Sequence, residues 1–243
     1  MPATRYKIWH VGGPVGRGAM SSIHVATAGV AKAAGEGMPY AVANELICSQ
    51  LARTVLLPVP PGFLIERDGI PYHVSLNFNL SGEDLPPADA AMVAQKHPQL
   101  ACGIILFDMW ILNPDRHNGN LAYDQSRDEV EVFDHSHAFY TSPAAMDALR
   151  NQTAIGGHCL AAEITQLAGM VYWAERVKLV PAFFIKEVVQ SAASVGLPAD
   201  HVDFCAQYLL ERQSRLLDIA RANRVNSPKV QPNLWDELDQ GGS

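Results

Sequence analysis

The chain has 243 residues, of which 48% are hydrophobic and 18% charged, a composition typical of a globular protein and not of a disordered one. Its net charge of −7 provides no long-range attraction to nucleic acid or to an anionic membrane, so direct nucleic-acid binding is not expected. The longest apolar stretch, residues 102–112, is broken by Asp108 and is too short to span a bilayer, so no membrane span is expected.

The first part of the chain is predicted to contain short strands. An alternating strand pattern at residues 7–11 precedes a glycine-rich stretch at residues 12–20. Two further β-rich runs, residues 23–27 and 30–34, flank a short turn. This arrangement predicts that the two runs pair with each other as a hairpin.

One helix and a second hairpin are predicted next. Residues 39–54 have apolar side chains at helical spacing and a proline in the first turn, which predicts a helix. Residues 63–78 contain two strand patterns on either side of Asp68-Gly69 and predict a hairpin. The polar, turn-rich segment at residues 80–89 predicts a hinge between two halves of the chain.

The second half has mainly helical patterns. A loop is predicted at residues 113–120, where Asn, Pro, Asp and Gly are concentrated, and a short hairpin at residues 121–133. Helices are predicted at residues 88–96, 99–112, 160–177, 182–194 and 201–223. We therefore predict an α+β chain with two lobes. Residues 1–80 form a small β-rich lobe with one helix, residues 81–227 a mainly helical lobe, and residues 228–243 a flexible tail.

Three residues of the second half predict phosphoryl transfer. Asp115 and Asn120 lie five residues apart in a loop after a helix, which is the spacing of the catalytic loop of protein kinases. Asp134 ends a strand fourteen residues after Asn120, and the hairpin between them returns the chain to the same place. Asp115 can accept the proton of a substrate hydroxyl. Asn120 and Asp134 offer the oxygen ligands that Mg²⁺ prefers.

The first half supplies candidates for binding nucleotide phosphates. Lys32 lies on the second strand after the glycine-rich stretch, and Glu45 on the following helix is its natural partner. The glycine-rich stretch can turn backbone N–H groups toward phosphate. Its candidate residues are Gly16, Gly18, Ser21 and Ser22. The order of these elements along the chain is that of a kinase, which predicts ATP and Mg²⁺ as cofactors.

At these residues the sequence resembles two known groups of kinases. DRHNGN at residues 115–120, followed by VFDHSHAF at residues 132–139, resembles the DRHxxN and ID-F/H-G signatures of phosphoinositide kinases. The resemblance to the HipA-like kinases, within the atypical phosphoinositide 3/4-kinase-like superfamily, is broader. It includes a glycine-rich opening, a strand lysine, the helix and turn NELICSQLARTVLLPVPPG and the DRHxGN loop, in the same order, from about Val11 to Phe139.

The resemblance implies a two-lobed kinase-like fold and assigns roles to the residues. Asp115 would be the catalytic base, Asn120 and Asp134 the metal ligands, and Lys32 the phosphate contact. Two features depart from the pattern. Ser136 stands where many relatives have glycine, and GGPVGRGAMSS is not the GxGxxG loop of protein kinases.

The function expected from these features is a protein Ser/Thr kinase with an antitoxin-like regulator as a possible partner. A small-molecule or lipid kinase of the same fold is an alternative, although the acidic balance argues mildly against an inositol lipid. A third alternative is a pseudokinase, an interaction module without activity.

Other interpretations of the same residues stay open. Asp115 and Asn120 can simply build a tight turn, Lys32 can be a solvated surface lysine, and the glycine-rich stretch can be a plain connector. A metal-dependent hydrolase would require His117 or His135 to bind metal directly. The ligand spacing of a zinc site is missing, so His117 and His135 are expected to orient the loop or its carboxylates instead. Arg116 is expected to pair with a nearby carboxylate.

The cysteines and the first residues predict a cytoplasmic location. The chain has four cysteines, none in CxxC spacing and each in an apolar stretch, which argues against a zinc site and favours a reducing compartment. The first thirteen residues lack the basic-then-apolar layout of a signal peptide.

Overall fold

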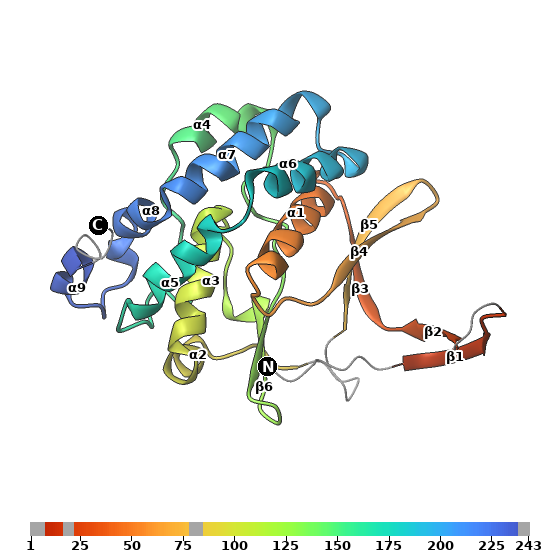
Figure 1. Cartoon of the computed structure of the whole chain (residues 1–243), viewed down its shortest axis with the longest axis horizontal. Helices are drawn as coiled ribbons and strands as arrows, with labels where there is room; N and C mark the ends of the chain where they lie inside the picture. Colours follow the sequence, from red (N-terminus) through yellow and green to blue (C-terminus); the bar gives the residue numbers. More distant parts are fainter. Residues whose placement is uncertain (1–7, 17–21, 78–84, 238–243) are drawn as a thin grey trace.

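The computed structural model describes residues 8–16, 22–77 and 85–237. A small β-rich region is followed by a mainly helical one, which confirms the predicted α+β fold (Figure 1). The strands are β1 Ile8–Pro14, β2 Ile23–Thr27, β3 Gly29–Ala33, β4 Gly62–Arg67, β5 Ile70–Leu76, β6 Leu121–Asp124 and β7 Glu129–Val132. The helices are α1 Ala41–Thr54, α2 Ala90–Lys96, α3 Pro98–Trp110, α4 Met146–Asn151, α5 Ala168–Lys178, α6 Ala182–Ser191, α7 Val202–Ser214, α8 Leu216–Ala222 and α9 Pro232–Glu237.

The sheet that carries Lys32 has three antiparallel strands in the order β3-β5-β4. Strands β4 and β5 form the hairpin predicted around Asp68-Gly69. Both turn residues have positive φ angles, 55° for Asp68 and 75° for Gly69. A two-residue hairpin loop requires these values, which Asp-Gly adopts readily. Strand β5 is central and places His73 opposite Lys32 of β3.

The predicted hairpin between residues 23–27 and 30–34 is wrong. Strand β2 pairs with β1, whereas β3 pairs with β5, so the two runs lie in different sheets. Only Ala28 separates them, and its carbonyl accepts a hydrogen bond from the backbone N–H of Asn77 at 2.9 Å. Gly29 serves close packing and not a turn, because a Cβ there would lie 2.7 Å from Val74 Cγ1.

Helix α1 belongs to the sheet and to the helical body at once. Eleven of its fourteen residues are buried. It packs against β3, β4 and β5 on one side and against α6 on the other. A helix that is covered on nearly all sides is a core element. The buried cluster accordingly runs without a break from Val42 and Ile47 of α1 into α3 and α7.

The helical body is organised around α3, which is buried from Ala101 to Trp110. The Trp110 indole N–H donates to the carbonyl of Leu209 in α7 at 2.9 Å. A Cβ at Gly103 would lie 2.2 Å from the Trp173 ring, so a glycine is needed where α5 crosses α3. This packing holds the end of α3, and therefore the loop after it, in a fixed position.

Two predicted boundaries, the lobe junction and the C-terminal tail, lie at the two ends of the helical body. Residues 78–84, which include half of the predicted lobe junction at residues 80–89, lie outside the described residues. The predicted tail at residues 228–243 is folded as far as it is described, because residues 232–237 form α9 and Trp235 is 4% exposed. Trp235 and Val230 join the main core, so this segment packs as part of the helical body.

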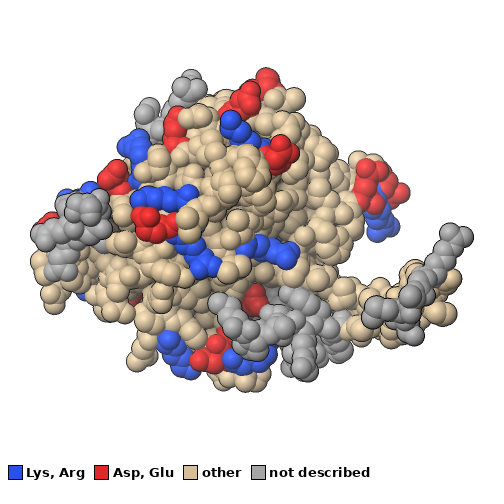
Figure 2. All heavy atoms as spheres, in the orientation of Figure 1, with Lys and Arg blue, Asp and Glu red and all other residues tan. Residues whose placement is uncertain are grey.

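Charged side chains of both signs are interspersed on the face of the molecule drawn in Figure 2. This face therefore presents no large area of a single sign that would attract a polyanion. Among the described helices, none has the length and apolar character needed to cross a bilayer.

Candidate functional site

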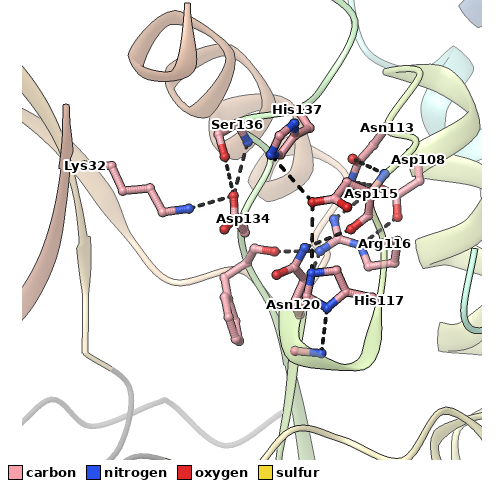
Figure 3. Close-up of polar contacts among 12 residues, drawn as sticks. Lys32, Asp108, Asn113, Asp115, Arg116, His117, Asn120, Asp134, Ser136 and His137 are labelled. Atoms are coloured by element: carbon pink, nitrogen blue, oxygen red, sulfur yellow. Dashed lines mark hydrogen bonds and ion pairs between the residues drawn. The ribbon is translucent and has the colours of Figure 1, made fainter. Parts of the chain in front are cut away.

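The predicted catalytic and metal-binding residues meet where the small sheet faces the helical body. Lys32 comes from β3, Asp115 and Asn120 come from the loop after α3, and Asp134 follows β7. Figure 3 shows Lys32 reaching Asp134 from one side, with Asp115 and Asn120 across from it. Segments up to 102 residues apart in the chain, from Lys32 to Asp134, thus contribute to one cluster.

Lys32 forms two ion pairs at once. Its Nζ lies 2.8 Å from Glu45 Oε1 and 2.7 Å from Asp134 Oδ1. Burial alone would lower the pKa of Lys32, but the two carboxylates outweigh burial and raise it. For Glu45 the effect of burial is the opposite, because burial alone would raise the pKa of a carboxyl group. His135 and Lys32 nevertheless hold the pKa of Glu45 well below its usual range. Lys32 is therefore a fixed cation, and Glu45 a fixed anion beneath it.

His135 lies beside Glu45. Its Nδ1 is 3.8 Å from Glu45 Oε2, and its side chain is almost fully buried. His117 is instead exposed on the outer loop, where its Nδ1 accepts a hydrogen bond from the Gly119 N–H at 3.0 Å. The described residues contain no group of three or more His, Cys, Asp or Glu side chains arranged to hold a metal. Both histidines contact carboxylates or loop backbone, the geometry expected of orienting residues.

Asp134 has a left-handed backbone conformation and a well-defined carboxylate. Its φ angle is 62°, in the left-handed region that non-glycine residues adopt rarely. The Ser136 hydroxyl donates to Asp134 Oδ1, and the Ser136 backbone N–H donates to the same atom at 3.4 Å. Burial would raise the pKa of Asp134, but Lys32 and Ser136 lower it. Ser136, which departs from the glycine of many relatives, thus fixes the Asp134 carboxylate.

The loop after α3 is held by its own side chains. Asn120 Nδ2 donates to the Asp115 carbonyl at 2.9 Å, and the Asp115 N–H donates to Asn113 Oδ1 at 3.2 Å. Because the nitrogen of the Asn120 amide is bonded in this way, its oxygen is the atom that can bind a cation. The Asp115 side chain is 44% exposed, and His137 Nε2 and His117 Nε2 lie 3.7 and 4.0 Å from its Oδ2.

Arg116 anchors this loop from inside the protein. Its fully buried guanidinium binds both oxygens of Asp108, through Nε at 2.8 Å and Nη2 at 3.1 Å. Its Nη1 donates to the carbonyls of Asn120 at 3.1 Å and Phe133 at 2.6 Å. One guanidinium therefore joins the loop of Asp115 to the strand end that precedes Asp134.

Asp108 completes the buried network. His158 Nε2 lies 3.0 Å from Asp108 Oδ2, and Asn113 Nδ2 donates to Asp108 Oδ1 at 3.0 Å. Burial alone would raise the pKa of Asp108, but Arg116 and His158 hold that pKa well below its usual range. The sequence does indicate that Asp108 needs a partner. Asp108 lies inside the apolar run at residues 102–112, and a charged side chain is rarely buried unless it is paired.

Replacing Arg116 with methionine is expected to cost about 3–5 kcal/mol of folding free energy, because Asp108 would remain buried without its partner. Chemical denaturation measures this loss. Arg67→Met is the matched control, since Arg67 is 81% exposed beside Asp68 and should change stability by less than about 1 kcal/mol. Equal stability of the two variants would contradict the anchoring role of Arg116.

A cavity of about 310 Å³ opens beside Lys32 and Asp134. Its volume is in the range of small-molecule sites. Most of its wall is apolar, and the two charged side chains lie on it together. The lining residues are Val30, Lys32, Pro60, Ser75, Leu76, Asn77, Leu85, Ala122, Phe133 and Asp134. The sequence alone does not reveal this wall, since its members come from six segments and most are ordinary core or strand residues.

The glycine-rich stretch does not join this cavity in the described structure. Gly16 and Ser22 are exposed at the outer end of the β1–β2 hairpin, which points away from the body of the molecule (Figure 1). Neither residue lines the cavity. Gly18 and Ser21, also predicted to contact phosphate, lie outside the described residues. The role predicted for these four residues stays a prediction.

Strand β7, which leads to Asp134, contains a further buried carboxyl group. Glu131 is 7% exposed, and burial raises its pKa to about 7, with Arg127 opposing and Glu129 adding to the rise. In the unfolded chain a glutamate titrates near 4.5. The folded protein therefore holds this proton more tightly, and stability should fall as the pH rises from about 4.5 to about 7.

Glu131→Gln is expected to remove this dependence. At pH 8 the variant should be more stable than the parent protein by up to about 3 kcal/mol, at about 1.4 kcal/mol per pKa unit, and near pH 4 the two should be alike. Thermal unfolding across this pH range tests the prediction. Glu66→Gln, on the exposed strand β4, serves as the control. A difference in Tm that does not change with pH would contradict the assignment.

Comparison with known proteins adds a family and a fold. The model of a family described as HipA-like kinase matches residues 30–158, which is more than half of the chain. No curated protein matches the sequence.

Two solved structures are similar to the chain. The crystal structure of the Helicobacter pylori proinflammatory kinase CtkA has a TM-score of 0.58 at 12% identity, over 90% of this chain and 95% of that one. This likeness shows the fold. The Shewanella oneidensis MR-1 toxin–antitoxin complex of HipA, HipB and operator DNA gives a TM-score of 0.43 at 12% identity, over 88% of this chain and 62% of that one. At that score the second likeness carries no argument.

Proposed function

Because the chain belongs to the HipA-like kinase family, we propose that it is an ATP- and Mg²⁺-dependent protein kinase that transfers the γ-phosphate to a serine or threonine hydroxyl. One observation supports this proposal above the others. Lys32 and Asp134 lie on the wall of a cavity in the size range of small-molecule sites, and Arg116 joins the loop of Asp115 and Asn120 to the strand end before Asp134. This is the set of groups that phosphoryl transfer requires.

The donor set fits a magnesium ion. The carboxylate of Asp134 and the amide oxygen of Asn120 are the hard oxygen ligands that Mg²⁺ takes in kinase sites. When bound, the ion neutralises charge on the β- and γ-phosphates. In this structure Lys32 Nζ forms an ion pair with Asp134 Oδ1 at 2.7 Å. The same Nζ can contact phosphate while its ion pair with Glu45 keeps the Lys32 side chain in place.

The cavity fits the rest of the nucleotide. Val30 and Leu76 from the sheet side and Ala122 and Phe133 from the helical side provide apolar walls for a planar base. A base bound against these walls would displace water from the cavity, which would strengthen the interaction of Lys32 with phosphate at the polar end.

Asp115 is the residue that would receive the proton of the acceptor hydroxyl. Its carboxylate is 44% exposed and is flanked by the half-exposed imidazoles of His117 and His137. A hydroxyl on a loop of another protein can reach a carboxylate that is open in this way. This openness supports a protein acceptor over a small molecule that must be enclosed.

The location and regulator are further parts of the proposal. A cytoplasmic location agrees with the four free cysteines, three of them buried. An antitoxin-like regulator is implied by the family alone, and so is membership of the wider phosphoinositide 3/4-kinase-like superfamily.

Transfer of the labelled γ-phosphate from ATP with Mg²⁺ tests the proposal. The purified protein is expected to label itself or a protein in an added lysate, and the Asp115→Asn variant is expected to lose this labelling. Labelling of small molecules or lipids instead would favour the alternative kinases. Tight Mg²⁺-ATP binding without transfer would favour a pseudokinase, and no nucleotide binding at all would overturn the proposal.

A further inference from the structure

Asn44 makes an unusual set of contacts next to Glu45 in α1. Its side chain is 1% exposed. Its Nδ2 lies 3.0 Å from the Ser136 carbonyl, 3.3 Å from the Ala138 carbonyl and 2.8 Å from the Tyr140 carbonyl. One amide nitrogen is thus surrounded by three backbone acceptors from alternate residues of the segment that follows Asp134.

These contacts attach the segment to α1 through a side chain. An amide nitrogen has two hydrogens, so the three carbonyls share two donors. Apart from them, few backbone bonds hold the segment. The Ala138 N–H donates to the His135 carbonyl at 3.0 Å, and the Phe139 N–H donates to the Ile111 carbonyl at 3.1 Å. Asn44 is therefore a principal connection between residues 136–140 and α1.

The segment begins at a residue that needs support. Asp134 has a φ angle of 62°, in a region that costs a non-glycine residue free energy unless local contacts stabilise it. Ser136, which binds the Asp134 carboxylate, is also the residue whose carbonyl Asn44 binds. The chain of contacts runs from α1 through Asn44 and Ser136 to the carboxylate.

The neighbouring residue of α1 holds the other side of the site. Glu45 binds Lys32, and Lys32 binds Asp134. Two consecutive residues of one buried helix therefore reach Asp134 by two routes, one through a cation and one through a backbone segment. Rigid support of this kind is what sets the position of a metal-binding carboxylate.

We propose that Asn44 is a positioning residue for phosphoryl transfer, which holds residues 136–140 against α1 and thereby sets the Asp134 carboxylate for Mg²⁺. This inference rests on the proposed function. Asn44 does not line the cavity, and it acts through Ser136 and the backbone of residues 136–140.

The test uses two variants of Asn44 and a matched control. Asn44→Ala removes all donors, and Asn44→Ser keeps one O–H donor. Asn223→Ala is the control, because Asn223 is 2% exposed and its Nδ2 also donates to two backbone carbonyls, those of Thr153 and Ile219, each at 2.8 Å. All three variants lose buried hydrogen bonds, and only the first two affect the segment after Asp134.

The first measurement is the Mg²⁺ concentration that gives half-maximal phosphoryl transfer at saturating ATP. Loss of a group that supports a metal ligand typically costs 10–100-fold in metal affinity, so Asn44→Ala should raise this concentration at least about 10-fold. Asn44→Ser should lie between Asn44→Ala and the parent protein, and high Mg²⁺ should restore most of kcat. Asn223→Ala should keep the parent value. The same Mg²⁺ dependence in Asn44→Ala and Asn223→Ala would overturn the inference and leave the proposed function standing.

The second measurement does not depend on kinase activity, so it separates the attachment of residues 136–140 by Asn44 from the proposed function. Amide hydrogen exchange of residues 135–140 should become faster in Asn44→Ala and, to a smaller extent, in Asn44→Ser, but not in Asn223→Ala. If the parent protein transfers no phosphate, the proposed function fails, and with it the catalytic part of the inference. Unchanged exchange in both Asn44 variants would overturn the attachment itself, whatever the activity. If Asn44→Ala does not fold, the serine variant carries both measurements.

Discussion

Asp134→Asn is expected to abolish Mg²⁺-dependent binding of ATP. The substitution removes the negative charge that the metal requires and keeps the size of the side chain. Removing a group that only supports a metal ligand lowers metal affinity by about 10–100-fold. Removing the ligand itself should therefore lower metal affinity by more than about 100-fold. Calorimetry with ATP, in the presence and absence of Mg²⁺, measures the difference directly.

The fold should survive this substitution. An asparagine oxygen can still accept the two hydrogen bonds from Ser136. Lys32 keeps its ion pair with Glu45 at 2.8 Å. Asp124→Asn is the matched control, because Asp124 is the last residue of β6 in the same hairpin but contacts Ser126 and Arg127 at its tip. Unchanged Mg²⁺-dependent affinity in Asp134→Asn would refute its role as a ligand.

Asp115→Asn is expected to reduce turnover by about 10²–10⁴-fold, the usual contribution of a general acid or base. Binding of Mg²⁺-ATP should stay close to that of the parent protein. The reason is positional: Asp115 contacts Asn120 through its backbone carbonyl, which the substitution leaves in place. Rapid-quench measurement of phosphoryl transfer, alongside the calorimetry described for Asp134, separates turnover from binding.

The two variants should therefore show opposite patterns. Asp134→Asn loses binding first, and Asp115→Asn loses turnover with binding intact. If Asp115→Asn weakens binding as much as it slows transfer, Asp115 is a ligand or a structural residue and not the base. His137→Asn can be measured beside Asp115→Asn to show whether the neighbouring imidazole affects turnover, since His137 Nε2 lies 3.7 Å from Asp115 Oδ2.

Local features of the fold could be predicted from the sequence. The β4–β5 hairpin follows from Asp68-Gly69, whose backbone preferences fix the turn without help from distant residues. Part of the shape of the loop between Asp115 and Asn120 is also local, because hydrogen bonds that span at most five residues join its ends. Each of these predictions depends on neighbours in the chain.

Features that depend on distant residues could not be predicted. The partner of β3 is β5, forty residues away, and nothing in residues 23–34 indicates that β2 and β3 lie in different sheets. The buried contact of Asp108 with His158 joins positions 50 residues apart. Asn44 and the carbonyls that it binds are separated by more than 90 residues. Such partners become visible when the chain is folded.

The burial of α1 limits the ways in which this kinase can be switched. Swinging α1 away from the sheet would break the pair between Lys32 and Glu45, but it would also expose Val42, Ile47 and Leu51, which are fully buried. Exposure costs about 1.5–3 kcal/mol for each such side chain. An inactive state that displaces α1 from the sheet would therefore cost several kcal/mol of folding free energy. Control is expected to act on entry to the cavity or to Asp115, which a partner can block without disturbing the core.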